Sequence, residues 1–223
     1  MRELLHYYFN LEVMWRYLPE MLGGFLVTVE MAVLIVIFGI LGGLVLAVVR
    51  AMRFWPVNLV LVFGVDVFRA VPPLVIMVFA YFALPYVGVT LSSFLAATIS
   101  LTLVLMAFAE EIFWAGITSV DKGQWEASRS TGMTYLQALF FVVLPQAIQL
   151  GIPPLTNRAI AITKGTSLAS VIAVQEIINR ASSAQSLAAN PSPLMLGAIL
   201  YLIIFAPLVR FSRWIEKRYG RKG

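Results

Sequence analysis

The sequence predicts an all-α integral membrane protein with five transmembrane helices. Of the 223 residues, 61% are hydrophobic and only 12% are charged, and the mean hydropathy is +0.90. This balance lies far outside the range of soluble domains. The apolar residues also gather into runs of about 20 residues or more, the length at which a helix crosses a bilayer. We therefore expect a single transmembrane domain over residues 1–223, without a separate soluble domain.

The first two apolar segments differ in regularity. We expect the first span at about Met21–Val49, after an aromatic segment that suits the membrane–water interface. Gly39 and Gly43 form a GxxxG pair, which favours close packing against another helix of the same chain. Residues 54–84 are also apolar, but Pro72–Pro73 must break or kink a helix. This second segment is either one broken span or a short interfacial helix that leads into a span.

Three further spans follow a short turn. We expect them at about 91–117, 147–174 and 194–209. The span at 147–174 is predicted to be irregular, because it contains Pro153–Pro154 as well as two cations. The polar segment Glu176–Pro193 is typical of an external loop.

The uneven distribution of lysine and arginine predicts the orientation. With the N-terminus outside, the external segments hold Arg2, Arg16 and Arg180. The cytoplasmic segments then hold a larger set: Arg50, Arg53, Lys122, Arg129, Arg210, Arg213, Lys217, Arg218, Arg221 and Lys222. This asymmetry places the C-terminus and the segment 121–145 in the cytoplasm. The C-terminal cations directly follow an apolar run, so we expect them to meet anionic lipid headgroups rather than nucleic acid.

The segment 121–145 lies between apolar spans but carries helix-boundary signals. Asp121 can accept a hydrogen bond from the Gln124 N–H and start a helix. Gly132 can end that helix in a left-handed conformation. The sequence therefore predicts a short helix on the water side of the membrane.

A second short helix is predicted directly afterwards. Thr134, followed three residues later by Gln137, is a capping-box pattern that starts a helix. Pro145 should then prevent its continuation. The segment is either two short helices joined at Gly132 or an ordinary polar loop between spans.

The same segment resembles the EAA loop of ABC-importer permeases. That pattern is Glu-Ala-Ala, three residues, Gly, nine residues, Ile, one residue and Leu-Pro. Every spacing matches here, with Ser128 in place of the second alanine and Val142 in place of isoleucine. The resemblance implies a coupling helix that docks into a groove of an ATPase subunit. The residues that carry it are Glu126, Ala127, Ser128, Gly132, Leu144 and Pro145.

Ionisable residues inside the apolar segments are candidates for a transport pathway, because burying them in lipid costs several kcal/mol unless they are paired or wet. Asp66 and Arg69 are three residues apart, so they can pair along one helix face. Glu30 could face a partner subunit or a crevice. The stretch from Lys164 to Ser167 would unwind or polarise a helix, as in the broken helices that line transport paths. Alternatively, the lysine snorkels to the interface.

A narrower resemblance points to the polar amino acid permeases of the histidine/glutamine/glutamate group. The stretch from Lys164 to Leu168 is similar to their Lys-Asp-Thr-Ser-Leu motif, and Phe68–Pro72 is similar to Phe-Arg-Gly-Thr-Pro. Glu111–Ile117 is similar to Glu-Ile-x-Arg-x-Gly-Ile, with Trp114 in place of arginine. The implied fold is the type I ABC importer transmembrane domain (MetI-like). The candidate substrate-pathway residues are Lys164, Gly165, Thr166, Ser167, Arg69 and Glu30.

The resemblance also implies partners in a bacterial inner membrane. These are an ABC ATPase dimer, a second permease chain (a paralogue or a copy), and a periplasmic or lipid-anchored amino acid binding protein. ATP and Mg would bind to the ATPase, because this chain has no G-x-x-x-x-G-K-[ST] stretch. Gly165 removes the acidic residue next to Lys164, which favours an acidic or neutral polar amino acid over a basic one. Glu30 or Glu176 could restore the missing charge.

Two other function classes remain as alternatives. A secondary amino acid carrier would leave the segment 121–145 unexplained. A membrane-embedded enzyme would need histidine, cysteine or paired acids around a cavity. The chain has no cysteine and one histidine, His6, and Glu110 and Glu111 are adjacent on a helix and point to different sides. We therefore expect no catalytic site, metal site or cofactor in this chain.

Overall fold

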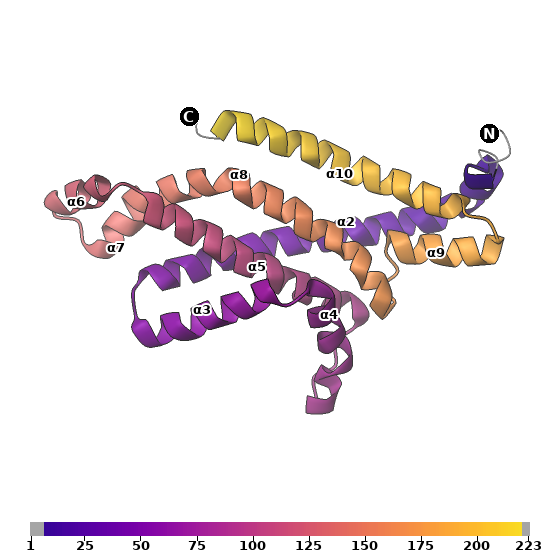
Figure 1. Cartoon of the computed structure of the whole chain (residues 1–223), viewed down its shortest axis with the longest axis horizontal. Coiled ribbons are helices and arrows are strands. Elements are labelled where there is room, and N and C mark those ends of the chain that lie inside the picture. The colour runs from indigo at the N-terminus through magenta and orange to yellow at the C-terminus, as the bar shows by residue number, and fades with distance from the viewer. Residues whose placement is uncertain (1–6, 220–223) are drawn as a thin grey trace. The chain divides into compact units, whose positions relative to one another are not determined.

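The structure is a computed structural model that describes residues 7–219 (Figure 1). Arg2, His6, Arg221 and Lys222 lie outside the described residues. Every regular element in the described range is a helix, as predicted. The chain forms two compact units. Unit 1 comprises the residues through Ile35, Pro73–Leu101 and Ile160–Val209, and unit 2 comprises Val36–Pro72, Thr102–Ala159 and the residues from Arg210 onwards.

Four long helical segments are apolar enough to cross a membrane, and a broken helix pair can supply a fifth span. The prediction of five spans agrees with this when the pair counts as one. The four segments are α2 (Leu11–Ala51), α5 (Ser93–Ser119), the run Tyr135–Ile172 and α10 (Ser192–Tyr219). The broken pair is α3 (Trp55–Ala70) and α4 (Pro73–Phe82). A short 3₁₀ turn, η1 (Leu84–Val87), leads from α4 towards α5.

Glycines in α2 allow close packing against α5 in unit 2. A Cβ built on Gly39 would lie 2.8 Å from the Leu105 side chain, and one on Gly43 would lie 2.5 Å from the Ala109 Cβ. Real Cβ atoms do not approach so closely, so larger residues would push the helices apart. The predicted role of the GxxxG pair in packing within the chain is thus confirmed.

The predicted external loop at 176–193 contains a helix, α9 (Ile177–Ala188), so that prediction was wrong. The Glu176 carboxylate accepts a hydrogen bond from the Asn179 N–H at 2.8 Å and caps the first turn. Ile177 and Ala181 then pack into the core of unit 1. The segment is polar on average, but its few apolar residues recur at helical spacing, which composition alone conceals.

The predicted break at Pro145 was also wrong. The backbone stays helical through α7 (Tyr135–Ala138), a π-helical turn (Leu139–Val143, η2) and α8 (Leu144–Thr163). Pro145 lies in the first turn of α8, directly after the π-helical turn, and a missing backbone N–H is tolerated at this position. The predicted irregularity of this span falls at Lys164, where α8 gives way to a 3₁₀ helix (Lys164–Ile172, η3).

Candidate functional site

A hairpin of two short helices, α6 (Lys122–Ser130) and α7, forms in the segment that carries the EAA-like pattern. The Asp121 carboxylate caps α6, but it accepts from the Gly123 N–H at 2.7 Å. The predicted donor, Gln124, instead binds the Asp121 backbone oxygen at 3.0 Å. Gly132 follows the end of α6 with φ 89°, the predicted left-handed conformation.

The predicted capping box begins α7. The Thr134 hydroxyl accepts from the Gln137 N–H at 3.3 Å, and the Gln137 side chain accepts from the Thr134 N–H at 2.8 Å. Two orphan backbone donors are therefore satisfied by one pair of side chains. The predicted first helix and the predicted start of a second helix after Gly132 are therefore both present, but the second helix does not stop at Pro145 and continues into α8.

Aromatic contacts hold the α6–α7 hairpin against the body of unit 2. Trp125 of α6 stacks on Tyr135 of α7, with ring centroids 5.1 Å apart and planes 16° from parallel. The Tyr135 hydroxyl donates to the Ala51 carbonyl oxygen at 2.8 Å, and the Arg53 guanidinium lies 5.5 Å from the Tyr135 ring centroid. The hairpin is thus fixed to the last residue of α2.

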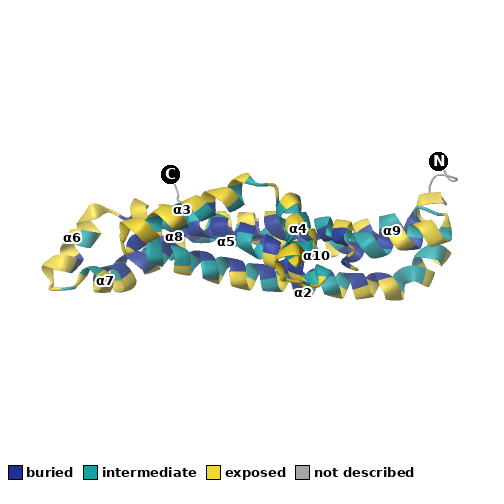
Figure 2. Cartoon of the chain, turned by 90° about the horizontal axis from the view of Figure 1, so that it is seen from below, coloured by how far each residue is buried: buried dark blue, intermediate teal, exposed yellow. Residues whose placement is uncertain are grey.

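The two sides of α6 differ in exposure (Figure 2). Glu126 and Ala127 are exposed, whereas Ser128 is buried. The Ser128 hydroxyl donates to the Trp125 carbonyl oxygen at 2.9 Å, so a serine can occupy this buried position without an unpaired polar group. Among the other residues of the pattern, Leu144 is buried in the core of unit 2 and Pro145 is exposed. Glu126 and Ala127 therefore form a free polar and apolar face.

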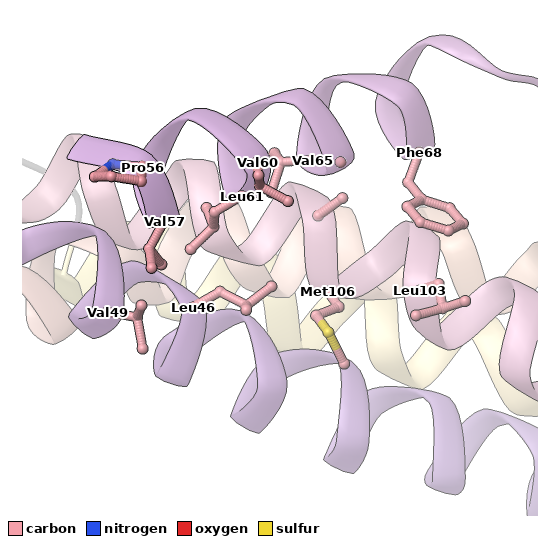
Figure 3. Close-up of a pocket in the computed structure, with 12 residues that line it drawn as sticks. Leu46, Val49, Pro56, Val57, Val60, Leu61, Val65, Phe68, Leu103 and Met106 are labelled. Carbon is pink, nitrogen blue, oxygen red and sulfur yellow. The ribbon is translucent and has the colours of Figure 1, made fainter. Parts of the chain in front are cut away.

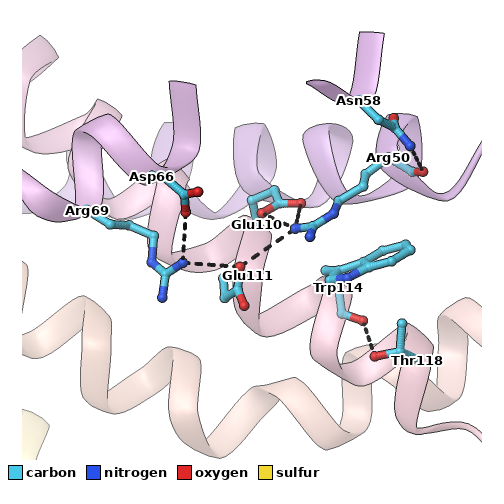
Figure 4. A network of polar contacts seen from close by, with 8 residues as sticks. All are labelled: Arg50, Asn58, Asp66, Arg69, Glu110, Glu111, Trp114 and Thr118. Atoms are coloured by element: carbon cyan, nitrogen blue, oxygen red, sulfur yellow. Dashed lines mark hydrogen bonds and ion pairs between the residues drawn. The ribbon is translucent and has the colours of Figure 1, made fainter. Parts of the chain in front are cut away.

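A charge network connects α2, α3 and α5 within unit 2 (Figure 4). Arg50 Nη1 lies 3.1 and 3.2 Å from the two carboxylate oxygens of Glu110, and 3.6 Å from Glu111 Oε2. The same Glu111 oxygen lies 3.2 Å from Arg69 Nη1. Arg69 Nη1 is also 3.5 Å from Asp66 Oδ1, which confirms the predicted pair. Glu111 therefore bridges two arginines.

Sequence reasoning missed the deepest pair of this network. The Glu110 side chain is 0% exposed and has Arg50 as its partner, although the two residues are 60 positions apart. The adjacent glutamates do point to different sides, but both reach Arg50. A single sequence carries no signal that would pair residues so far apart.

Aromatic rings surround the cations of the network. The Trp114 ring, which stands where the resembled motif has arginine, lies 4.6 Å from the Arg50 guanidinium carbon. An aromatic face stabilises a cation, whereas an arginine there would repel it. The Phe108 ring lies 4.0 Å from Arg158 and 5.6 Å from Arg69. Arg69 Nε is buried without a hydrogen-bond partner among the described residues.

The predicted pathway stretch that starts at Lys164 lies in unit 1. The Thr166 hydroxyl donates to the Thr163 carbonyl oxygen at 2.9 Å, and the Ser167 hydroxyl donates to the Lys164 carbonyl oxygen at 3.0 Å. These bonds accompany the 3₁₀ geometry. Lys164 itself is exposed, with its Nζ 5.9 Å from the Phe205 ring centroid.

No carboxylate is ion-paired with Lys164 within residues 7–219. Glu176, which could have supplied the charge, is fully buried and accepts from the Tyr201 hydroxyl at 2.6 Å. Burial raises the pKa of the Glu176 carboxyl, and the bond from Tyr201 opposes that rise. Glu30 is exposed on α2. Among the described residues, the Lys164 charge therefore contacts an aromatic ring but has no ion-paired carboxylate.

The arrangement suits binding and coupling. Among the described residues, no group of histidine, cysteine or acidic side chains could hold a metal ion. The chemically notable features are an exposed helix face and a charge network in unit 2, and in unit 1 a lysine that has no ion-paired carboxylate among the described residues and is close in sequence to two hydroxyl groups.

Comparisons with known proteins all match the chain to membrane components of transport systems. Residues 39–221 match the family described as "Binding-protein-dependent transport system inner membrane component". The chain is 37% identical over 199 residues to the "Probable glutamine ABC transporter permease protein GlnP" of Bacillus subtilis (strain 168), covering 87% of this chain and 91% of that protein. It is 37% identical over 207 residues to the "L-cystine transport system permease protein TcyB" of the same organism, with coverages of 91% and 88%.

Solved structures share the fold. The "Crystal structure of an amino acid ABC transporter with histidines" matches with a TM-score of 0.83 at 32% identity, over 92% of this chain and 96% of that chain. An inward-facing structure of the MetNI methionine ABC transporter matches with a TM-score of 0.73 at 20% identity, over 93% and 98%, which shows the fold alone. These likenesses confirm the predicted type I importer fold.

Proposed function

Because the chain belongs to the family of binding-protein-dependent transport system inner membrane components, we propose that it is the permease subunit of an ATP-driven amino acid importer. The family supplies transport subunits rather than enzymes. Similarity to proteins described as glutamine and cystine permeases supports an amino acid substrate.

One observation carries the coupling role: α6 is exposed at Glu126 and Ala127 while Trp125 and Tyr135 fix its other side to unit 2. A face that is free yet rigidly mounted can receive force from a partner and pass it on. We assign ATPase docking to this face, and the ATPase dimer brings its own ATP and Mg. Glu126 and Ala127 form the docking surface of α6, and Gly132 ends that helix. Ser128, Leu144 and Pro145 hold α6 in position against the rest of unit 2.

Two routes lead from the docking face into the membrane segments. The Tyr135–Ala51 bond reaches the end of α2, and the π-helical turn leads directly into α8. ATPase closure drives transport only if it stabilises one permease conformation more than the other. The π-helical turn is a suitable point of adjustment, since such turns hold less favourable backbone geometry than an α-helix.

The free charge of Lys164 suggests the substrate class. An amino acid with a spare carboxylate, or a neutral polar one, would meet a lysine that is not ion-paired with any carboxylate of the described residues. Gly165, Thr166 and Ser167 offer backbone and hydroxyl groups beside it. Arg69 and Glu30 are further candidates for the pathway, because Arg69 keeps an unpartnered buried Nε and Glu30 is an exposed acid within an apolar span.

The remaining features of the proposal concern assembly. The chain pairs with a second permease, for which we favour a related chain over an identical copy, and a periplasmic or lipid-anchored binding protein delivers the amino acid. The distribution of lysine and arginine supports an external N-terminus and a cytoplasmic C-terminus. This orientation presents α6 to a cytoplasmic ATPase.

ATPase activity of the reconstituted complex tests the proposal. With binding protein and a panel of amino acids, we expect one class to stimulate hydrolysis in the wild type. Glu126→Lys should abolish this stimulation, while Glu20→Lys, the same change at an exposed residue of α2, should retain it. If no ATPase associates with the chain, or if Glu126→Lys transports normally, α6 is not a coupling element and a secondary carrier becomes the better interpretation.

A further inference from the structure

An apolar groove runs between α2, α3 and α5 on unit 2 (Figure 3). Its volume is about 570 Å³, within the range of small-molecule binding sites. The side chains that line it are almost all aliphatic: Leu46 and Val49 from α2, Val57 and Val60 from α3, and Met106 from α5 are representative. Such a lining offers no specific polar partner along its length, so it suits a hydrocarbon chain.

Glycine keeps the middle of this groove open. Gly64 lines it from α3, and a Cβ built on Gly64 would meet no atom within 4 Å. This differs from Gly43 of α2, where a Cβ would collide with α5. Close helix packing therefore does not require a glycine at position 64, and its effect is to leave space in the groove.

One end of the groove lies at the turn between α2 and α3. Val49 and Pro56, which flank this turn, are among the lining residues. The neighbouring Trp55 is 74% exposed and Phe54 is also exposed, as expected for aromatic residues at a membrane–water interface. The groove thus begins at headgroup depth and continues along α3 into the apolar region.

The turn at this end of the groove carries a cation, Arg53. Arg53 is exposed, and no described carboxylate is paired with it, whereas Arg50 is engaged by Glu110. Arg53 also holds a left-handed backbone conformation, φ 60°, which glycine or asparagine would adopt at lower cost. An arginine at such a position suits recognition of a phosphate group.

We infer that the groove between α2, α3 and α5 binds an anionic phospholipid, with an acyl chain beside Gly64 and the phosphate at Arg53. The groove is aliphatic, and the turn at its end carries Arg53, which has no carboxylate partner among the described residues, so the two together complement such a lipid in shape and charge. The Arg53 guanidinium also lies over Tyr135 of the α6–α7 hairpin. The lipid headgroup would therefore sit beside the segment that we assign to coupling, although lipid binding itself does not depend on that assignment.

Native mass spectrometry of the full chain, purified in detergent and titrated with phosphatidylglycerol or phosphatidylcholine, tests this inference. We expect the wild type to bind one phosphatidylglycerol more tightly than phosphatidylcholine. Arg53→Gln should weaken phosphatidylglycerol binding about fivefold, the typical effect of one basic residue at a charged lipid surface. Arg16→Gln, the same charge change at an exposed position near the start of α2 and outside the groove, should leave it unchanged.

A second pair of variants tests the groove itself. Gly64→Leu adds a side chain whose Cβ meets no atom within 4 Å, and it should weaken binding of both lipids because the acyl chain loses its space. Gly23→Leu is the matched control, since a Cβ at Gly23 also meets nothing within 4 Å but lies on α2 outside the groove. Equal lipid binding by the two leucine variants would overturn the inference. A protein dimer that only Gly64→Leu dissociates would overturn it too, by identifying a second copy as the occupant.

Discussion

Tyr135 of α7 donates a hydrogen bond to the carbonyl oxygen of Ala51, the last residue of α2, over 2.8 Å. The final carbonyls of a helix have no partner within the helix, so this bond satisfies one of them. It also connects residues 84 positions apart in the sequence. The α6–α7 hairpin is thereby fixed to a membrane helix by one hydroxyl group as well as by ring stacking.

Removing that hydroxyl should loosen the hairpin without unfolding it. Tyr135→Phe keeps the ring that stacks on Trp125 and loses one hydrogen bond, so we expect a stability loss of about 1 kcal/mol. Amino acid transport per ATP hydrolysed should fall, because α6 would move without moving α2. Transport and hydrolysis measured in the same vesicles give this ratio. Tyr86→Phe is the control, as Tyr86 is 92% exposed; an equal ratio in both variants would contradict the role of the bond.

Gly132 should be needed for its backbone conformation rather than for space. Its φ is 89°, and a Cβ there would meet nothing within 4 Å, so Gly132→Ala introduces backbone strain of about 1–2 kcal/mol and no clash. Gly88 has nearly the same geometry, with φ 83° and open space, but lies in the turn after η1. We expect thermal unfolding in detergent to show similar losses for Gly132→Ala and Gly88→Ala.

Their effects on transport should nevertheless differ. Gly132→Ala should reduce substrate-stimulated ATP hydrolysis, because the strain changes the angle between α6 and α7. Gly88→Ala should not. If both variants reduced it equally, lost stability would explain the result and the hairpin geometry would not.

The two glutamates of the charge network should differ in their contribution to stability. Glu110→Gln leaves Arg50 facing a fully buried neutral side chain and should cost about 3 kcal/mol. Glu111→Gln removes the charge of a side chain that is 40% exposed, and the loss should stay below about 1 kcal/mol. The midpoints of thermal unfolding of the two variants give the comparison. The reverse order would show that Glu111, which bridges the two arginines, contributes more to stability than the buried Glu110.

The sequence predicted those parts of the fold that depend on local chemistry. The Thr134–Gln137 capping box, the left-handed Gly132 and the Asp66–Arg69 pair each involve residues at most a few positions apart, and all are present. The family was recognised from a longer pattern, but one that still lies within a single continuous stretch of sequence from Glu126 to Pro145. Long-range relationships had no such signal, so the Arg50–Glu110 pair was missed.

The average polarity of a segment is a poor guide to its structure where a helix buries only one side. In α9, Ile177 and Ala181 are buried, but the serine, asparagine and alanine around them give a loop-like composition. Pro145 led to the opposite error, the prediction of a break where the backbone is helical, because a proline in the first turn of a helix costs little. The π-helical turn before it has no recognised sequence signal, and it allows the backbone to stay helical from α7 into α8.

The charge beside Lys164 should set the preference between acidic and basic substrates. Gly165→Asp places a carboxylate next to the lysine and would partly neutralise it, so uptake should shift towards basic amino acids. The new Cβ would lie 3.3 Å from Leu101 Cδ2, which requires only a small movement of that side chain. Competition for uptake between glutamate, glutamine and arginine measures the shift. Gly165→Asn has the same shape without the charge and should leave the preference unchanged; if both variants behaved alike, steric effects at position 165 and not the lysine charge would govern selection.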